Sequence, residues 1–459
     1  MVSQSSDPHG AKLSGRRAPS QGRGWLSSLI LGLGLLLVYT ANGRELDADD
    51  TEGTTMLTLS LVRGDGFSLD RFSVLLGDGN HLLPFVARSH GRIVSRYPVA
   101  PALLIAPLMV PQIALWDLRQ PGWDRHPGRV IKACRRMAKW WMSVLLALAA
   151  VTFHGYLLRL GLQRGALPAT VAAFLGSDLW THASQALWQH GPAALALIAA
   201  LALLHPGPVS RWRMVLAGMA TTLLFTSRLL DSIFAAVIVA WLVRTQPRRL
   251  SWFLPVPIVG AGLLFFYNLW NFGTIIGGLA QLEDLHPQFH GVLGSWSGSL
   301  VEGAAGTLFS PNRGLLIFSP WVAVALGVAA VPAVARRLAS QGLIPWLLAA
   351  LVPYFLLLSK YSVWWGGHCF GARYWTDVIP LFAIVLAFGL EWMRTHSRSL
   401  AALAYLTIAF SIGVHGIGAF CYPSTWNALP ANVDLHHERL WNWRDTELSR
   451  CLIEKMLDR

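Results

Sequence analysis

The chain has 459 residues, of which 54% are hydrophobic and only 13% are charged, and its mean hydropathy is +0.45. A soluble domain carries about 25% charged residues, so this composition excludes an ordinary soluble protein. The net charge of +13 does not indicate nucleic-acid binding, because Lys and Arg lie in short clusters between apolar runs. We predict an all-α polytopic integral membrane protein, whose spans are helical because lipid offers unpaired backbone groups no partner.

Residues 1–24 are polar and basic, and we expect them to form a disordered cytoplasmic tail. The first apolar run, Trp25–Ala41, has no small-residue cleavage site behind it, so we interpret it as a retained anchor. The stretch Asn42–Glu52 follows directly and carries five acidic side chains in eleven residues. We predict that residues 42–98 form a large extracytoplasmic first loop with short surface helices such as Thr54–Arg63.

Residues 25–421 alternate apolar runs with polar segments and are expected to form about eleven membrane-spanning helices, within a range of about ten to thirteen. Three arginine clusters mark the cytoplasmic side of the membrane: Arg244–Arg249, Arg336–Arg337 and Arg394–Arg398. Three polar segments then lie outside: the second large loop at residues 271–313, Lys360–Arg373, and a short C-terminal tail at residues 422–459. Cys421 and Cys451 could form a disulfide if both lie outside, although free thiols are equally compatible with the sequence.

The first half of the chain allows two topologies. If the proline-broken run Val99–Trp116 crosses the membrane, the cationic segment Arg119–Lys139 is cytoplasmic and Met214–Val243 is one long helix. If that run only dips into the surface, Met214–Val243 becomes two short helices that turn near Arg228 and Asp231. The positive-inside bias favours the first arrangement. Length favours the second, which we prefer, because thirty helical residues reach ~45 Å against a ~30 Å hydrocarbon core.

The outward segments bring acids, cations and aromatic side chains to one side of the membrane. A carboxylate can accept a proton from an acceptor hydroxyl as a general base, and Arg or Lys can hold a phosphate leaving group. Trp and Tyr faces can stack on a sugar ring. This combination suits transfer of a sugar from a lipid-phosphate donor that enters sideways from the bilayer.

Each of these features also has a plain structural interpretation. An acidic run after a helix is often a solvated loop, and Arg313 and Arg373 could be snorkelling anchors at span ends. Trp364 and Trp365 could belong to an interfacial belt. The histidines, including His190 and His368, show no zinc-like spacing and could be hydrogen-bonded surface residues.

The arrangement of one span, a large outer loop with an early carboxylate and a many-helix body resembles the GT-C glycosyltransferase superfamily. Its members include protein O-mannosyltransferases, the lipid A aminoarabinose transferase and oligosaccharyltransferases. The resemblance is closest to uncharacterised bacterial members and covers nearly the whole chain. The similar stretches are Asp49–Thr51, Ser95–Pro98, Leu187–Pro192, Phe309–Leu315, Trp364–Arg373 and Arg439–Asp445.

The resemblance implies a GT-C-like helix bundle and an inverting transfer from a polyprenyl-phosphate sugar on the outer face. The family's first-loop carboxylate falls on Asp50, with Asp49 second, as the general base. Arg313 and Arg373 are candidates for the lipid phosphate, with Lys360 behind them. The remaining substrate-binding candidates are Arg96, Tyr97, Trp364, Trp365, His368 and His190. Some relatives use a divalent cation such as Mg or Mn, so the use of a metal stays open.

The expected partners are the polyprenyl-phosphate sugar, membrane lipid, and a glycan, lipid or protein acceptor, with no nucleic acid. We expect a multi-pass protein of the bacterial inner membrane, with a cytoplasmic N-terminus and an extracytoplasmic active site. One alternative is a lipid or solute transporter or flippase, which should show inverted repeats and charges near the midplane. The other is a non-catalytic GT-C-like scaffold of the cell envelope, against which the intact acidic cluster argues.

Overall fold

The computed structural model describes residues 21–77, 81–204, 209–284, 294–422 and 424–457. Residues 1–20 of the predicted tail lie outside the described residues. Residues 21–24, which we also assigned to the tail, form the first turn of helix α1 (Gln21–Thr40). The predicted boundary of the tail at residue 24 is therefore wrong, because the helix already includes residues 21–24.

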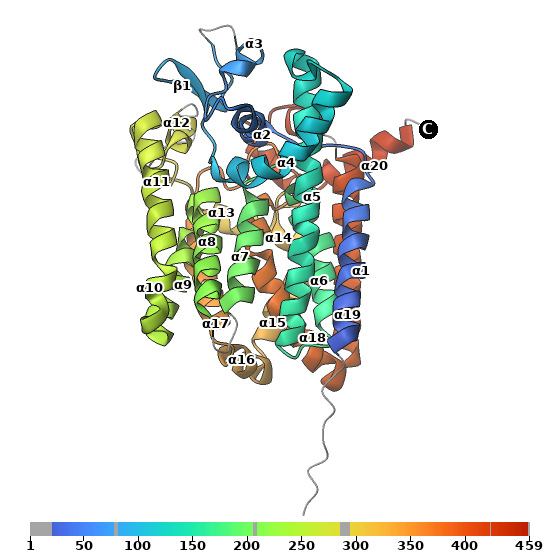
Figure 1. Ribbon diagram of the computed structural model, residues 1–459. Helices are drawn as coiled ribbons and strands as arrows, with labels where there is room; N and C mark the ends of the chain where they lie inside the picture. Colours follow the sequence, from blue (N-terminus) through green and yellow to red (C-terminus); the bar gives the residue numbers. More distant parts are fainter. Residues whose placement is uncertain (1–20, 78–80, 205–208, 285–293, 423, 458–459) are drawn as a thin grey trace, which may run out of the picture.

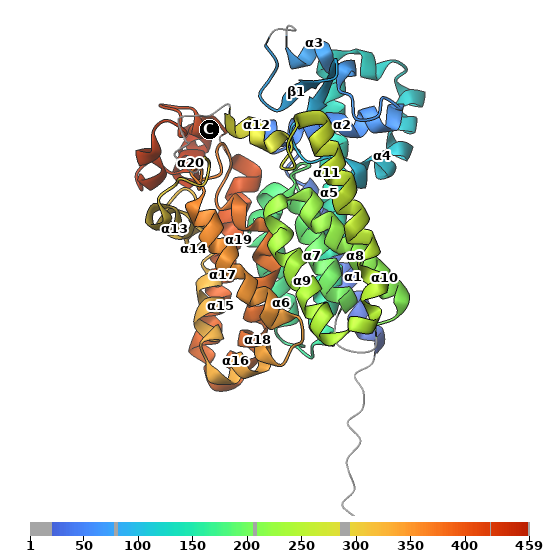
Figure 2. The same cartoon turned by 90° about the vertical axis from the view of Figure 1, so that its left-hand side faces the viewer.

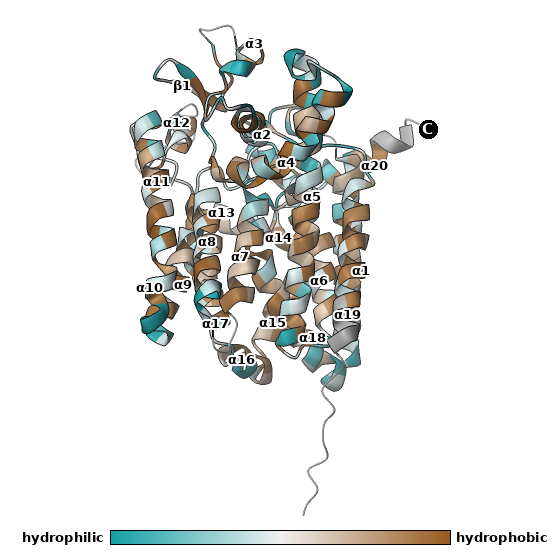
Figure 3. Ribbon diagram, viewed as in Figure 1, coloured by the Kyte–Doolittle hydropathy of each residue, from teal (hydrophilic) through white to brown (hydrophobic). Residues whose placement is uncertain are grey.

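Most described helices run side by side along one direction and form a bundle, and shorter elements cover one end of it (Figures 1 and 2). The bundle helices are α1, α5 (Pro127–Arg159), α6 (Ala166–Leu175), α7 (His190–Leu204), α8 (Arg211–Ser227), α9 (Ser232–Thr245), α10 (Leu250–Phe253), α11 (Pro255–Phe272), α15 (Trp321–Ala329), α17 (Ile344–Lys360), α18 (Ile379–His396) and α19 (Arg398–Cys421). Helix α16 (Pro332–Ala339) lies across the end opposite the shorter elements, after a bend of 86° from α15. Figure 3 shows apolar residues along the bundle and polar residues gathered towards its two ends.

The bundle has the character of a helical membrane protein. Among the described residues, four helices are long and apolar enough to cross a membrane, or six if each of two bent pairs counts as one span. Five shorter apolar helices accompany them. Helices α7 and α18 are buried on nearly every side, which explains why their sequences are apolar all round. The all-helical membrane class is confirmed, whereas the number of about eleven spans stays a prediction.

The first loop is a folded cap. Helices α2 (Asp49–Arg63) and α4 (Ala100–Arg119) lie across the end of the bundle instead of along it (Figures 1 and 2). Between them lie a turn at Asp70–Phe72 (η1), α3 (Ser73–Leu76), and an antiparallel hairpin of β1 (Val86–Ser89) and β2 (Arg92–Ser95). The hairpin, which we did not predict, turns at His90 and Gly91 with φ of 48° and 77°, the left-handed conformation that two-residue hairpin turns require.

Helix α2 begins five residues before the predicted Thr54. Asp49, Asp50 and Glu52 all fall in its first turn, where negative charge interacts favourably with the helix dipole. Ala48 supplies the extended N-cap residue, and the Thr51 hydroxyl accepts a hydrogen bond from the Ala48 N–H at 3.2 Å. The acidic cluster is therefore the start of a helix and not a solvated loop.

The arrangement of the helices resembles the second topology, but α4 is itself one of the four helices that are long and apolar enough to cross a membrane, so the topology stays a prediction. Helix α4 lies in the cap, and Met214–Val243 divides into α8 and α9 around a turn at Leu229–Asp231 (η4). The basic start of α5 lies against the acidic stretch, where Arg135 Nε is 2.8 Å from Asp47 Oδ2. Two cations of this segment, Arg135 and Arg136, thus pair with carboxylates of the acidic stretch, which the positive-inside bias does not take into account.

The C-terminal tail folds back over the same end of the bundle as the cap (Figure 2). It contains turns at Ser424–Asn427 (η8) and His437–Trp441 (η9), followed by α20 (Glu447–Leu457). A disulfide joins Cys421 to Cys451, so the pairing that the sequence left open is present. The second large loop contains α12 (Gly278–Asp284) and α13 (Leu300–Phe309) and leads into α14 (Leu315–Phe318), while residues 285–293 lie outside the described residues.

Candidate functional site

Asp50 lies where the cap meets the bundle. Its Oδ1 accepts a hydrogen bond from the Tyr97 hydroxyl at 2.7 Å, and its Oδ2 forms an ion pair with Arg373 Nη1. The Asp50 side chain is 23% exposed, whereas that of Arg373 is 8% exposed. A carboxylate offers about four lone-pair positions, so this acid can still accept a proton or a hydrogen bond from a bound molecule.

The segment that precedes α2 is fixed to the bundle. Asn42 Nδ2 donates to Gln185 Oε1 and to the Ala419 carbonyl, each at 2.8 Å. Lys139 of α5 donates to Asn42 Oδ1 and to the Arg44 carbonyl. These hydrogen bonds fix Asn42 and Arg44 to the bundle. The bundle therefore helps to define the position of the first turn of α2, which follows a few residues later.

The Arg373 side chain is held by aromatic rings. Its guanidinium carbon lies 5.0 Å from the centre of the Trp188 ring and 5.3 Å from that of Tyr374, within the range of cation–π contacts. Its Nε is buried and has no hydrogen-bond partner among the described residues. Because this nitrogen is buried, a bound anion would reach the guanidinium from the side of Asp50, where Nη1 forms its ion pair.

Tyr97 remains a neutral hydrogen-bond donor to Asp50. Burial, and then the Asp50 charge, raise the pKa of the Tyr97 phenol well above its usual range. The backbone N–H of Tyr97 donates to Ser95 Oγ at 3.2 Å, which orients the residue after strand β2. The contact between Tyr97 and Asp50 therefore joins the two halves of the cap.

Asp49 occupies the more open side of the same helix turn. It is exposed, and partial desolvation, and then the charge of Asp50, raise the pKa of its carboxyl. His368 acts against that rise. The His368 ring lies near Asp49 and is held by Asn432 at 3.1 Å and Asp434 at 3.3 Å.

Two of the other three acids of the cluster are occupied by Arg135, and the third, Glu45, lies 3.4 Å from Arg136 Nε. Asp47 and Glu52 both pair with it, and Glu52 is almost fully buried. Burial, and then a hydrogen bond with Asp47, raise the pKa of Glu52 to about 7, with Arg135 opposing the rise. These contacts attach α2 to α5. Asp49 and Asp50 are the acids of this helix turn that do not pair with Arg135 and that stay accessible to solvent.

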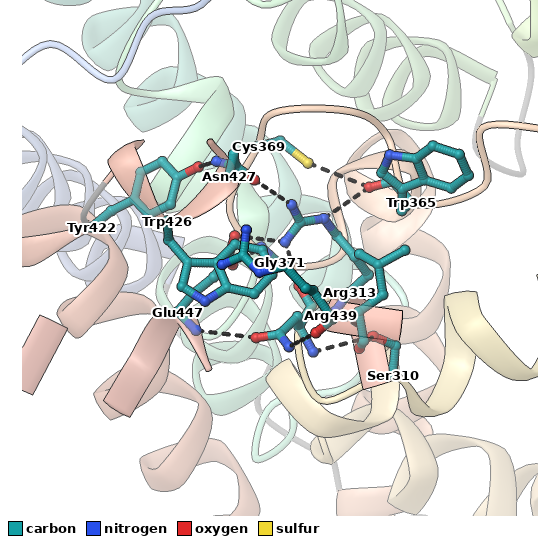
Figure 4. A network of polar contacts seen from close by, with 12 residues as sticks. Ser310, Arg313, Trp365, Cys369, Gly371, Tyr422, Trp426, Asn427, Arg439 and Glu447 are labelled. Carbon is teal, nitrogen blue, oxygen red and sulfur yellow. Dashed lines mark hydrogen bonds and ion pairs between the residues drawn. The ribbon is translucent and has the colours of Figure 1, made fainter. Parts of the chain in front are cut away.

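Arg313 lies in a separate, closed network that Figure 4 shows. It is 2% exposed, and it donates to the Trp365 carbonyl at 2.9 Å, Glu447 Oε1 at 2.6 Å and Asn427 Oδ1 at 2.7 Å. Its guanidinium also lies 5.4 Å from the ring centre of Trp426. Since every nitrogen already donates within the protein, Arg313 anchors the C-terminal tail and does not suit a lipid phosphate, contrary to our expectation.

Three more predicted substrate residues are also engaged by the protein. Trp364 and Trp365 are buried in a small core with Trp426, so neither presents a free ring face to a sugar or to an interfacial belt. Lys360 Nζ donates to the Gly298 carbonyl at 2.9 Å and thereby holds the second large loop. The side chains of these three residues contact other parts of the protein. The sequence alone does not distinguish such contacts from contacts with a substrate.

Arg96 and Tyr97 border a small cleft at the junction of cap and bundle. The cleft lies between α8 and α11, and its walls include Phe225, Tyr267 and Phe272. The buried Tyr267 hydroxyl has no hydrogen-bond partner among the described residues. Tyr97 therefore contacts this largely apolar cleft on one side and Asp50 on the other.

His190 and Arg228 meet at an acid that the sequence analysis missed. His190 is fully buried, and its Nδ1 lies 2.7 Å from Asp377 Oδ1. Arg228 forms an ion pair with the other oxygen of Asp377, and not with Asp231 as the sequence suggested. The available signal was an acid four residues after Arg373, at the start of an apolar run.

A metal centre is not evident in the described part of the chain. No group of three or more His, Cys, Asp or Glu side chains there is arranged to hold a metal ion. Asp50 pairs with Arg373, and Asp49 lies near His368. Positive charge on either partner opposes binding of a metal cation to these two acids. We therefore derive no step through Mg or Mn.

No family model matches the chain, and no curated protein matches it. One solved structure is similar: the crystal structure of ArnT from Cupriavidus metallidurans bound to undecaprenyl phosphate. The similarity covers 86% of this chain and 75% of that chain, with 14% sequence identity and a TM-score of 0.45. At that level the function has to be inferred from the contacts within this chain.

Proposed function

We propose that this protein is a membrane glycosyltransferase with a GT-C-like fold. It transfers a sugar from a polyprenyl-phosphate donor to an acceptor on the extracytoplasmic face. The observation that carries the proposal is the contact of Asp50 with Arg373 and Tyr97, which joins a partly exposed carboxylate to a buried cation. Such a pair supplies the two groups that the transfer requires, a general base and a cation for the leaving phosphate.

In the proposed reaction, the acceptor hydroxyl oxygen attacks the anomeric carbon of the sugar as Asp50 takes its proton. The bond from that carbon to the phosphate oxygen breaks, and its electron pair leaves with the phosphate. Arg373 stabilises the charge that develops there, through the guanidinium group that pairs with Asp50 before the donor binds. The products are a glycosylated acceptor and a polyprenyl phosphate.

The ion pair between Asp50 and Arg373 is then a resting state. A donor phosphate competes with the Asp50 carboxylate for the guanidinium, since both are oxygen anions. Binding of the donor releases Asp50, which becomes a free carboxylate beside the bound sugar. This order would keep the base neutralised until the donor is present.

We propose that the lipid chain reaches the site beside the small cleft between α8 and α11. Its walls are mostly apolar, and Arg96 and Tyr97 belong to its lining. Helix α11 exposes Ile258, Leu263 and Phe266 on its outer surface, as expected for a helix that faces lipid. A donor whose chain follows this cleft would bring its phosphate to Tyr97, one hydrogen bond away from Asp50.

The site belongs on the extracytoplasmic face of the proposed bacterial inner membrane. The disulfide between Cys421 and Cys451 lies at the same end of the molecule as the cap, and disulfides persist in oxidising compartments. The arginines of α16 lie at the opposite end, as the positive-inside bias predicts for the cytoplasmic side. The acceptor, whether glycan, lipid or protein, would approach from the side of Asp49 and His368.

The decisive experiment follows the release of free polyprenyl phosphate. The wild type in nanodiscs is incubated with a panel of polyprenyl-phosphate sugars and with membrane extract as the acceptor source. Asp50→Asn should lower the rate by about 10²–10⁴-fold, the contribution expected of a general base. Asp65→Asn is the matched control, because Asp65 pairs with Arg71 elsewhere on the cap.

The same assay separates the alternatives. A large loss in Asp49→Asn with an active Asp50→Asn would move the base to Asp49. Equal activity in both variants would remove the acid assignment. If the wild type consumes no donor of the panel, the glycosyltransferase proposal fails, and a lipid-flipping assay then tests the transporter against the scaffold.

A further inference from the structure

We propose that Arg228 and Asp377 are positioning residues that hold Arg373 in place for the donor phosphate. The inference rests on the proposed function, because it concerns the same phosphate site. Arg228 and Asp377 are buried and do not face the opening, so they act through other groups. The group that connects them to Arg373 is its neighbour Tyr374.

Tyr374 lies between two guanidinium groups. The guanidinium carbons of Arg373 and Arg228 each lie 5.3 Å from the centre of its ring. The backbone carbonyl of Tyr374 accepts hydrogen bonds from Arg228 Nη1 at 3.3 Å and from the Tyr354 hydroxyl at 2.6 Å. Both the ring and the backbone of the residue next to Arg373 are therefore fixed from inside the bundle.

Asp377 fixes the same turn a second time. Arg373 and Asp377 belong to one short helical turn, Arg373–Val378 (η7). The carboxylate of Asp377 pairs with Arg228 through one oxygen and with His190 through the other, at 2.7 Å. Since Arg228 binds this turn at two places, the orientation of Arg373 depends on the pair.

The pair becomes most important when the donor binds. In the resting structure, Arg373 is held by Asp50 and by the rings of Trp188 and Tyr374. If the donor phosphate displaces Asp50, the two rings remain as the support of the guanidinium. The Tyr374 ring can hold the Arg373 guanidinium in place only if Tyr374 itself is fixed. Arg228 fixes it by its contacts with the Tyr374 ring and carbonyl.

Asp231 supplies a matched control. It is fully buried beside Asp377, to which a protonated Asp231 can donate a hydrogen bond. Arg228 forms its ion pair with Asp377, so a charged Asp231 would be an unpaired buried carboxylate, which is unfavourable. We therefore treat Asp231 as protonated, and asparagine closely matches a protonated aspartate in shape.

The first test measures donor KM and kcat. Removal of one member leaves an unpaired buried charge and can prevent folding, so the main variant is the double substitution Arg228→Gln with Asp377→Asn. We expect kcat/KM for the donor to fall about 10²-fold, chiefly through KM, the scale of loss that misplaced binding groups produce. Asp231→Asn should stay within about twofold of the wild type. Tyr354→Phe, which removes one hydrogen bond to the Tyr374 carbonyl, is a milder variant if the double substitution does not fold.

The second test does not depend on turnover. A double-mutant cycle of Asp50→Asn and Arg373→Gln measures their coupling as a non-additive shift in the apparent thermal midpoint. The coupling should persist in the Asp231→Asn background and weaken in the Arg228→Gln, Asp377→Asn background. Unchanged coupling, or an unchanged donor KM in a folded variant, would overturn the inference. A wild type without donor turnover would refute the proposed function, while this cycle would still decide whether the pair positions Arg373.

Discussion

Arg313 and Arg373 differ in how many of their hydrogen-bond donors the protein already uses. Arg313 donates from each of its nitrogens to fixed groups, one of which is the buried Glu447. The Nε of Arg373 has no hydrogen-bond partner among the described residues, and its Nη1 forms an ion pair with the partly exposed Asp50. At the scale of a residue, an arginine with free donors can bind a substrate, whereas a fully bonded arginine stabilises the fold.

The pair of His368 and Asp434 gives a pH dependence. The hydrogen bond that His368 donates to Asp434 raises the pKa of His368 above its usual value of about 6.5. The bonds from His368 and Trp365 hold the pKa of Asp434 below its usual range, although burial acts in the opposite direction. A raised histidine pKa contributes stability that is fully present below about pH 6.5 and is lost as the pH rises through the folded-state pKa.

We therefore predict that His368→Gln lowers the apparent thermal midpoint more at pH 5.5 than at pH 8.5. The Asp434 contribution does not alter this sign, since a lowered acid pKa costs stability only at lower pH. His436→Gln is the control, because its partner Glu438 is highly exposed. Equal losses for His368→Gln at both pH values would contradict the charged pair.

Close packing between helices fixes the second large loop. Helix α13 carries Gly303 and Gly306 on its buried face. A Cβ at Gly303 would lie 2.0 Å from the Ser359 carbonyl oxygen of α17, and one at Gly306 would meet the Trp364 ring at 2.4 Å. At the scale of an element, glycine is required here for approach of the backbones and not for an unusual φ.

Gly303→Ala should destabilise the protein despite the better helix propensity of alanine. Alanine gains about 0.5–1 kcal/mol in a helix, whereas overpacking typically costs about 1–3 kcal/mol, so we expect a net loss. Gly262→Ala in α11 is the matched control, since a Cβ there meets nothing within 4 Å. The apparent thermal midpoint of each variant measures the effect, and equal midpoints would contradict the packing argument.

The whole molecule has chemically different ends. The cap, the disulfide and the folded tail lie at one end, and α16, with Arg336 and Arg337, lies at the other (Figures 1 and 2). The remaining thiols, Cys134 and Cys369, are buried. Single cysteines introduced at exposed positions of the two ends can therefore report the orientation in the membrane with little background.

We predict that Leu435→Cys in the tail reacts with a membrane-impermeant thiol reagent in intact cells. Ser340→Cys, which follows α16, should react only after the cells are opened. Both positions are exposed in the structure, so a difference in labelling reports the side of the membrane and not burial. Labelling of position 340 in intact cells would invert the proposed topology and place the site in the cytoplasm.

The sequence by itself determined the helical membrane class and the acidic first loop, whereas it left open whether Met214–Val243 is one helix or two. These features depend on composition, on segment length and on charges close together in the chain. Only the tertiary structure decided that Asp50 meets Arg373 across more than three hundred residues, and that Arg313 and Trp365 belong to the closed core of the tail. The physical reason is that a side chain's role depends on which of its donors and faces are already occupied, and those partners are distant in sequence.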